Sequence, residues 1–268
     1  MSVTFVVRQL VLRVRQVFTH FDNPWAILWS IATRRQDVVF EVDGLRVRTL
    51  NSPAAWGPVL EVFVEDEYAF EWFTGDLRSD AVAVDIGAHV GCFAMAFARR
   101  FPGGSVASYE PTPSTGEYTV GNVETNGLAE RVTVHRMAVA ARTGSFRMAD
   151  NGPGRAHNGV LYLGQAGSTT IEVAARSFVE VMADAGDTVD LVKLDAEGAE
   201  YDILLGTDPG LLAPVRRFVL EFHPSPDHHF GELRTHLESA GLELVRETSL
   251  GPDLGLAWFS RDPLDRTA

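Results

Sequence analysis

The chain has 268 residues, of which 46% are hydrophobic and 22% charged, a composition typical of one large globular domain or a domain with an appendage. Its formal net charge of -13 argues against a nucleic-acid partner, because binding to phosphates normally requires a basic face. Cys92 is the single cysteine, which excludes an internal disulfide and favours a reducing, cytoplasmic compartment. A cytoplasmic protein of enzyme size is therefore expected.

The first 18 residues combine apolar side chains at helical spacing with Arg8, Arg13 and Arg15. The segment contains no apolar run long enough for a membrane span and no signal-peptide pattern, so neither export nor a span is predicted. The spacing predicts a basic amphipathic helix. Two alternatives stay open for residues 1–18: packing on the domain, which we favour, or contact with a membrane or partner surface.

Residues 1–80 lack a nucleotide-binding pattern and are interpreted as an N-terminal cap of helices and a hairpin, followed by a binding domain over residues 81–268. Within the cap, a helix is predicted over 24–33. Residues 38–50 alternate apolar and polar side chains around Asp43 and Gly44, which is typical of a hairpin with a two-residue turn.

From residue 81 the chain alternates short apolar runs with segments of helix length, which indicates an α/β fold with a mostly parallel sheet. The predicted strands are 81–86, 105–109, 132–136, 191–194, 218–222, 242–246 and 256–260. The predicted helices are 92–100, 112–125, 200–205 and 229–240.

The sequence also predicts the structure of two further segments of this domain. The last two strands are joined only by a glycine-rich turn, so they should pair antiparallel at one edge of the sheet. Residues 142–170 are rich in glycine and polar side chains, and we expect an irregular loop or lid over the site.

The first predicted strand runs into a glycine turn. In VAVDIGAHVG, residues 82–91, the apolar run ends in Asp85 and continues into Gly87 and Gly91, which let backbone approach a ligand closely. Glu110 follows the second strand 25 residues after Asp85, where a carboxylate can bind both hydroxyls of a ribose. Together the glycine turn and the acid predict a nucleoside site at the strand ends.

The turn also bears on which nucleoside binds. It lacks the G-x-G-x-x-G pattern that holds a pyrophosphate at a helix N-terminus. The charge of Asp85 would repel a pyrophosphate and would suit the ammonium group of an amino acid. S-adenosylmethionine, with its ribose, adenine and cationic methionine tail, satisfies these constraints better than NAD and is the predicted cofactor.

A second group of acids follows the fourth predicted strand. Lys193 and Asp195 share one side of this strand, and Glu197 and Glu200 open the next helix. Open α/β sheets bind ligands at the carboxyl ends of their strands, so we place at least one of Asp195 and Glu197 at the transferring methyl group. Glu200 is interpreted as an acid favoured by the helix dipole.

The fifth predicted strand ends in EFHP, which brings Glu221 and His223 to the same edge. His223 could accept a proton from a substrate hydroxyl, or could serve only as a structural histidine before a proline. Asp195, Glu197, Glu221 and His223 could also hold Mg²⁺, but no spacing rule selects this reading, and no metal ligand is assigned.

Four ordered segments resemble the FkbM family of S-adenosylmethionine-dependent methyltransferases: VAVDIGAHVG, SYEPTPSTGEYTVGNVETNGLAERVTVHRMAVA, LVKLDAEGAEYDILLG and FVLEFHP. The resemblance covers roughly residues 60–225, and D-x-E-G-A-E is its most specific part. It implies the Rossmann-like class I methyltransferase fold, a seven-stranded sheet with helices on both faces and an antiparallel edge. It also implies methyl transfer to a hydroxyl of a sugar, glycan or polyketide-type natural product.

The resemblance further implies roles for individual residues. It assigns cofactor binding to a set that includes the glycine turn, the ribose acid and the adenine side: Asp85, Gly87, Ala88, Gly91, Glu110, Pro111, Asn122, Ala138 and Asp195. Independently of the resemblance, their position at the strand ends makes Asp195, Glu197 and His223 the predicted catalytic residues. His89 stands where asparagine is common, and we interpret it as a neutral loop-capping residue.

Two other functions are compatible with part of this pattern. An NAD-dependent oxidoreductase would share the ribose acid but would favour the missing G-x-G-x-x-G and would lack D-x-E-G. A non-catalytic cofactor-binding module could be recruited through the N-terminal helix, although the acids after strands four and five speak against it. The acceptor, expected to be a small molecule or glycan, and the oligomeric state stay open.

Overall fold

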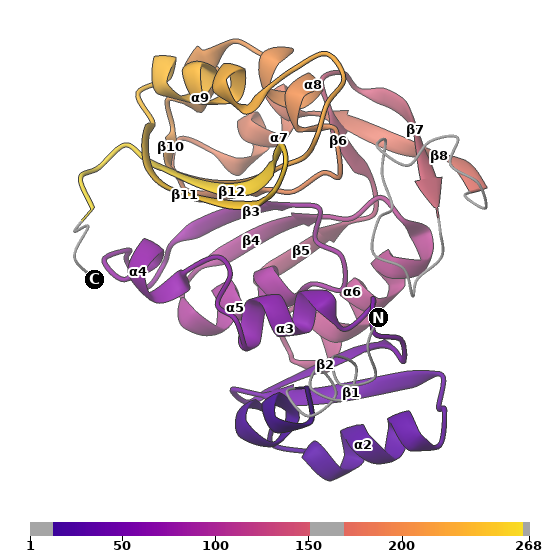
Figure 1. Cartoon of the computed structure of the whole chain (residues 1–268). Helices are drawn as coiled ribbons and strands as arrows, with labels where there is room; N and C mark the ends of the chain where they lie inside the picture. The colour runs from indigo at the N-terminus through magenta and orange to yellow at the C-terminus, as the bar shows by residue number, and fades with distance from the viewer. Residues whose placement is uncertain (1–12, 151–168, 265–268) are drawn as a thin grey trace.

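The computed structural model describes residues 13–150 and 169–264 (Figure 1). The predicted helix over residues 1–18 lies mostly outside the described residues, but residues 13–20 are helical. In the described part of the chain, every helix is too short or too polar to cross a membrane.

The main sheet has seven strands in the order β11-β12-β10-β9-β3-β4-β5. Its strands are, in chain order, β3 (Val82–Ile86), β4 (Ser105–Tyr109), β5 (Val132–His135), β9 (Val189–Leu194), β10 (Val215–Phe222), β11 (Glu243–Gly251) and β12 (Leu254–Ser260). All seven strands coincide with the predicted ones to within a few residues. The α/β class and the strand count expected from the sequence are therefore confirmed.

The strands β5, β4, β3, β9 and β10 run parallel, so their carboxyl ends meet at one edge. β12 lies antiparallel between β10 and β11, which confirms the predicted antiparallel pair at the edge. From β3 the chain proceeds outward to β4 and β5 and later returns to β9 on the other side of β3. This reversal creates the crevice in which open α/β sheets bind ligands.

Helices cover both faces of the sheet (Figure 1). The helices after the hairpin are α3 (Gly57–Phe63), α4 (Phe70–Thr74), α5 (Cys92–Arg100), α6 (Pro113–Thr125), α7 (Phe178–Ala185), α8 (Glu200–Leu205) and α9 (Phe230–Ser239). One apolar cluster joins α3, α4 and α5 to the sheet, and a second joins α7, α8 and α9 to its other face. α3 and α4 thus share a core with α5, and the domain boundary at residue 80 stays a prediction.

The predicted hairpin is present as β1 (Asp37–Val42) and β2 (Leu45–Leu50). Its turn residues Asp43 and Gly44 both have positive φ, 51° and 76°, as a two-residue hairpin turn requires. The preceding helix α2 (Pro24–Ala32) packs on β1, at the far end of the molecule from α9 (Figure 1). The amide of Asn122 fixes the hairpin to α6 through two hydrogen bonds with the backbone of Arg48, at 2.8 and 2.9 Å.

Residues 142–170 are not wholly irregular, which corrects the expectation of a loop. A second sheet of three strands contains β6 (Ala138–Ala140), β7 (Gly144–Asp150) and β8 (Thr169–Ser177), and residues 151–168 of the expected lid lie outside the described residues. β7 pairs antiparallel with β8, where polar outward-facing residues such as Arg147 and Glu172 lie opposite each other and conceal the strand pattern.

Candidate active site

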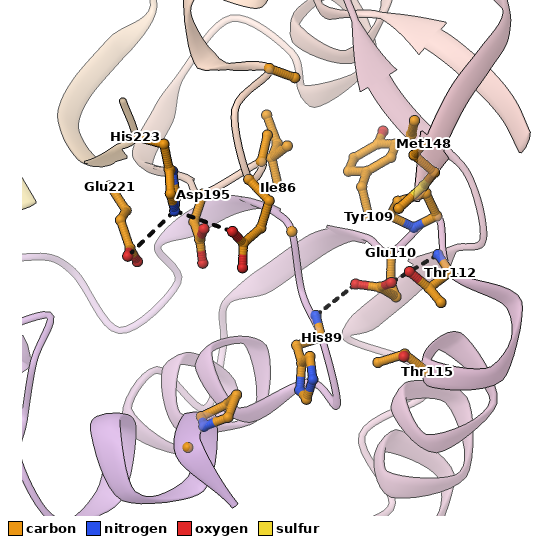
Figure 2. Close-up of a pocket in the computed structure, with 18 of the residues that line it drawn as sticks. Ile86, His89, Tyr109, Glu110, Thr112, Thr115, Met148, Asp195, Glu221 and His223 are labelled. Carbon is orange, nitrogen blue, oxygen red and sulfur yellow. Dashed lines mark hydrogen bonds and ion pairs between the residues drawn. The ribbon is translucent and has the colours of Figure 1, made fainter. Parts of the chain in front are cut away.

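A pocket of about 570 Å³ opens at the carboxyl ends of the parallel strands (Figure 2). Its floor comes from the ends of β3, β4, β9 and β10, one wall from the segment before and within α3, and another from β6 and β7. Residues from these elements include Ile86, Gly87, Glu110, Asp195, Glu197, Glu221 and His223 on the floor, and Pro53, Gly57, Glu61, Ala138, Phe146 and Met148 on the walls.

The glycine turn takes up left-handed backbone at three alternate positions, Gly87, His89 and Gly91, with φ of 80°, 50° and 87°. A Cβ atom at residue 87 would lie 1.7 Å from the carbonyl oxygen of Asp195, so only glycine allows the two strand-end loops to approach so closely. Burial lowers the pKa of His89 to about 4, which keeps its imidazole neutral, as expected for a loop residue.

Glu110 is held with its carboxylate at the pocket. Its two oxygens accept hydrogen bonds from the backbone N–H groups of His89 and Thr112, at 2.9 and 2.8 Å (Figure 2). Burial outweighs these bonds and raises the pKa of Glu110 to about 7. Because each carboxylate oxygen has a second lone pair, the fixed group can still accept a bond from each of two neighbouring hydroxyls.

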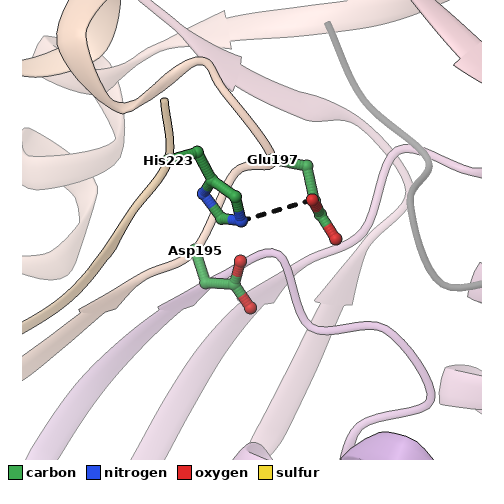
Figure 3. Close-up of side chains that lie close together, drawn as sticks. All are labelled: Asp195, Glu197 and His223. Carbon is green, nitrogen blue, oxygen red and sulfur yellow. Dashed lines mark ion pairs between the residues drawn. The ribbon is translucent and has the colours of Figure 1, made fainter. Parts of the chain in front are cut away.

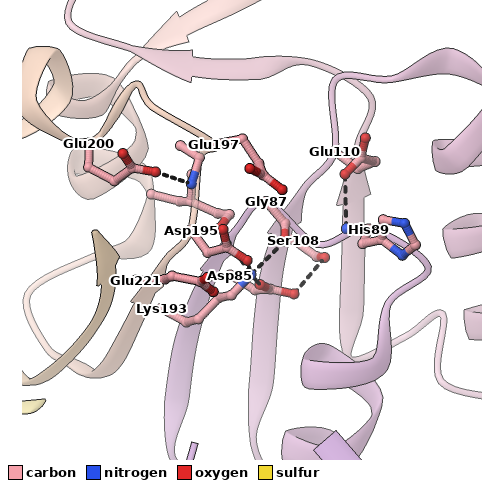
Figure 4. A network of polar contacts seen from close by, with 12 residues as sticks. Asp85, Gly87, His89, Ser108, Glu110, Lys193, Asp195, Glu197, Glu200 and Glu221 are labelled. Carbon is pink, nitrogen blue, oxygen red and sulfur yellow. Dashed lines mark hydrogen bonds and ion pairs between the residues drawn. The ribbon is translucent and has the colours of Figure 1, made fainter. Parts of the chain in front are cut away.

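Asp85 lies beneath the pocket rather than in its lining. It is fully buried, 3.4 Å from the ammonium group of Lys193, which also lies 3.3 Å from Asp195 (Figure 4). The Lys193 ammonium donates to the carbonyl of Gly87 at 2.5 Å. Burial opposes the charge on Lys193, but Asp195 and Asp85 prevail and raise its pKa. The carboxylate that faces the pocket on this side is that of Asp195.

The loop from Asp195 to Glu200 folds around a single buried carboxylate. Glu200 accepts hydrogen bonds from the N–H groups of Ala196, at 2.8 Å, and Gly198, at 3.1 Å (Figure 4). Glu197 and Gly198 have positive φ, 49° and 101°, which turns the chain sharply before α8. Glu200 therefore does more than favour a helix dipole, since it shapes the loop that carries Glu197.

The same carboxylate orients the imidazole of His223, which is 5% exposed at the end of β10. Nδ1 of His223 lies 3.1 Å from Glu200, and Nε2 lies 3.3 Å from Glu197 (Figure 3). Burial disfavours the charged ring, but the hydrogen bond to Glu200 and the nearby acids prevail and raise the pKa of His223 to about 10. With nothing bound, the imidazole therefore carries a proton at neutral pH.

Further acids surround this imidazole. Burial and the charge of Asp195 raise the pKa of Glu221 to about 9, and its carboxylate lies 3.7 Å from Nε2 of His223. Across the pocket, burial and the neighbouring Glu67 raise the pKa of Glu61 to about 8. The pocket thus gathers acidic side chains between α3 and the ends of β9 and β10, and a bound cation would favour the charged form of those whose pKa is raised.

Asp195, Glu197 and His223 also meet the spacing of a metal site. One ligand atom from each residue lies within 4.8 Å of the others. Nδ1 of His223 is bound to a carboxylate, as second-shell groups of metal sites often are. The same geometry serves a histidine base, whose Nε2 is left facing the pocket.

The structure brings most of the expected site residues together. The pocket lining contains Gly87, Glu110, Pro111, Ala138, Asp195, Glu197 and His223, but not Asp85, Ala88, Gly91 or Asn122. The sequence reasoning did not assign Glu61, Glu67, Thr115 or the role of Glu200. Glu200 carried a usable signal, since an acid three residues after Glu197 could reach back into the loop. The sequence around Glu61 and Glu67 contains no such signal.

The strand order and the site at the strand ends define an enzyme of the class I, S-adenosylmethionine-dependent methyltransferase fold. The methyltransferase domain of METTL16 has a similar fold, with a TM-score of 0.53 and 12% identity over 96% of this chain and 92% of that one. Residues 85–244 match the methyltransferase FkbM domain, and the chain belongs to this family.

Individual relatives support this membership at modest identity. AMB antimetabolite synthetase AmbE of Pseudomonas aeruginosa is 29% identical over 225 residues, which cover 70% of this chain but only 10% of that protein. Methyltransferase sdnD of Sordaria araneosa is 23% identical, with 78% of this chain and 90% of the relative covered. The 31-O-demethyl-FK506 methyltransferase FkbM of Streptomyces tacrolimicus is 25% identical, with 76% and 88% covered.

Proposed function

We propose that this protein transfers a methyl group from S-adenosylmethionine to a hydroxyl of a sugar, glycan or polyketide-type natural product. The observation that carries the proposal is the imidazole of His223, held by Glu200 and facing the pocket across from the fixed carboxylate of Glu110. The name of the Streptomyces tacrolimicus relative, a methyltransferase of 31-O-demethyl-FK506, supports an oxygen acceptor.

The pocket residues fit the predicted cofactor. The Oγ1 atom of Thr115 and Nδ1 of His89 are buried without a hydrogen-bond partner among the described residues, and both side chains line the pocket. Such atoms call for a polar ligand, because unpaired buried groups are costly. Glu110 would bind the ribose hydroxyls, and the acids near Asp195 would attract the cationic tail. Bound there, S-adenosylmethionine supplies an electrophilic methyl group on a sulfonium.

His223 is the proposed base for the acceptor hydroxyl. Nε2 would accept the hydroxyl proton, while Glu200 holds Nδ1–H and stabilises the imidazolium that results. In the free protein the surrounding acids keep this ring protonated. Because the same acids line the pocket, positive charge bound among them is expected to lower the pKa of His223 toward neutrality and free the base.

Asp195 and Glu197 would position the acceptor. Both carboxylates flank the imidazole and face the pocket, so they can accept hydrogen bonds from neighbouring hydroxyls of a polyol. Methyl transfer to oxygen depends chiefly on alignment of the two reacting atoms, which such contacts provide. The choice of acceptor would lie with the walls, from Pro53 to Glu61 and at Phe146 and Met148.

The proposal is tested in two stages. Calorimetry with S-adenosylmethionine and S-adenosylhomocysteine tests the donor site, and mass spectrometry of a panel of hydroxylated acceptors tests transfer. His223→Asn should retain cofactor binding and lower kcat by about 100-fold to 10,000-fold, the usual contribution of a general base. His228→Asn is the matched control, because His228 pairs with Glu232 outside the pocket lining.

The outcomes separate the alternatives. Failure of the wild-type protein to bind S-adenosylmethionine would refute the proposal, and binding of NAD instead would indicate an oxidoreductase. Cofactor binding with no transfer to any acceptor class would favour a non-catalytic module.

A further inference from the structure

The surface of α2 is unusually apolar for its exposure. Its nine residues, PWAILWSIA, include no charged side chain, yet only Ile27 is buried. Trp25 and Trp29, four residues apart and therefore on one face of the helix, are 75% and 61% exposed. Phe18, which is 43% exposed, extends this surface, with its ring edge-on to Trp25 at 5.0 Å between centroids. We call Phe18, Trp25 and Trp29 the aromatic face.

The charge around the aromatic face is opposite to that of the whole chain. Residues 13–36 contain four arginines and one aspartate, although the net charge of the chain is -13. Arg15 on the preceding helix, and Arg34 and Arg35 directly after α2, are exposed, and no ion pair engages them among the described residues. Aromatic side chains flanked by arginines are the composition of segments that bind at the interface of a membrane.

We propose that this protein docks peripherally on bilayers that contain anionic lipids, with the aromatic face inserted at the headgroup level and Arg15, Arg34 and Arg35 against the phosphates. Tryptophan rings prefer the membrane-water interface, and each arginine near an anionic surface adds to the attraction. The docking surface lies at the end of the molecule formed by α2 and the β1–β2 hairpin (Figure 1).

Charge also favours lipid over a second copy of the chain. In a twofold dimer through this face, each arginine would lie near the arginines of the other copy, because such an interface is self-complementary. Among residues 13–36, Asp22 is the only acid that could offset that repulsion, and Asp37 and Glu41 of the hairpin already pair with Arg48 and Arg46. An anionic bilayer covers the rings and neutralises the arginines together.

Flotation of the full chain with lipid vesicles tests the proposal. We expect binding to vesicles of phosphatidylcholine with phosphatidylglycerol, weak binding to phosphatidylcholine alone, and weaker binding as salt is raised. Trp25→Ser combined with Trp29→Ser should lower the partition coefficient at least tenfold. Arg34→Gln combined with Arg35→Gln should lower it about 25-fold on the anionic vesicles, roughly fivefold per charge.

Matched controls lie on the opposite end of the molecule. Val179→Ser on α7 replaces an exposed apolar residue and Arg142→Gln before β7 replaces an exposed arginine, and both should leave partitioning unchanged. Because both tryptophans are exposed and outside the pocket lining, the double variant should keep its melting temperature and its methyl transfer to a water-soluble acceptor.

Three results would overturn the proposal. The first is a wild-type chain that stays off anionic vesicles, and the second is a double tryptophan variant that binds them as the wild type does. The third is a dimer in sedimentation velocity that the tryptophan substitutions dissociate, which would assign the aromatic face to a second copy. None of these depends on whether the methyl acceptor has been identified.

Discussion

The carboxylate of Glu200, at the start of α8, lies 3.1 Å from Nδ1 of His223, at the end of the neighbouring strand β10. Because Glu200 also binds the backbone of Ala196 and Gly198, one buried acid sets both the orientation of the imidazole and the shape of the loop beside it. The pair therefore joins two strand ends in one polar unit.

Glu200→Gln should weaken this unit in two measurable ways. Loss of the orienting charge should lower kcat by about 10-fold to 100-fold with little change in the KM for S-adenosylmethionine. Without the negative charge the pKa of His223 should fall, so the rising limb of the pH profile of kcat should move to lower pH. Steady-state kinetics between pH 6 and 10 would measure both effects.

The matched control is Glu232→Gln, because Glu232 makes a similar pair with His228 at 3.2 Å on the surface. An equal loss of kcat in this control, or an unshifted limb in Glu200→Gln, would show that Glu200 has only a structural role.

Glu110→Gln should act on cofactor binding. The amide can accept bonds through only one of its two terminal atoms, so it cannot hold both backbone N–H groups and both ribose hydroxyls. We expect S-adenosylmethionine and S-adenosylhomocysteine to bind about 10-fold to 100-fold more weakly, as measured by calorimetry. Glu117→Gln, an exposed change on α6, should leave the affinity unchanged. Unaltered affinity in Glu110→Gln would place the ribose elsewhere.

Glu61→Gln should stabilise the free protein at alkaline pH. Burial raises the pKa of Glu61 from 4.5 to about 8, so the folded chain binds this proton more tightly than the unfolded chain does. The free energy of unfolding therefore falls as pH rises between those values. Removing the carboxyl should recover about 1 to 3 kcal/mol above pH 8 and almost nothing below pH 4.5.

Urea denaturation at pH 4, 7 and 9 would measure this difference. Glu124→Gln, at an exposed position on α6, serves as its control. A Glu61→Gln variant no more stable than the wild type at pH 9 would mean that Glu61 is not strained by burial.

Removal of divalent metal should leave methyl transfer unchanged. Nε2 of His223 and the carboxylate of Glu197 already lie 3.3 Å apart, and Glu200 holds the other ring nitrogen, so the base is oriented without an ion. Activity measured after treatment with EDTA, with and without added Mg²⁺, tests this expectation. Loss of activity that Mg²⁺ restores would instead make Asp195, Glu197 and His223 the ligands of a metal.

The sequence predicted the main sheet well because its parallel strands are buried on both faces and appear as continuous apolar runs. In β9, all six residues from Val189 to Leu194 are buried and four of them are apolar, so the run is recognisable although Asp190 and Lys193 interrupt it. β8 was missed for the opposite reason, since its exposed positions carry Glu172, Ala174 and other small or polar residues near the surface. α7 was missed too, although Ser177 and Glu180 form the capping box that could have signalled its start.

Within the candidate site, the sequence predicted the residues whose place is fixed by the strand that they follow. Glu110, Asp195 and His223 directly follow parallel strands, so they had to meet at one edge. Tertiary pairing could not be predicted: the charge of Asp85 is taken up by Lys193 beneath the pocket. The position of Glu61 in the pocket lining could not be predicted either, because it depends on how α3 packs against the sheet.

The contacts of Lys193 limit how this pocket can change to accommodate different acceptors. Its single ammonium group holds Asp85 and the Gly87 carbonyl on one loop and Asp195 on the next, while residue 87 leaves no room between the loops for even a methyl group. The two loops are thereby locked into one rigid floor, and neither can shift without breaking buried ion pairs. An acceptor of a different size must therefore be accommodated by exchanging side chains on the surrounding walls, such as Phe146 and Met148.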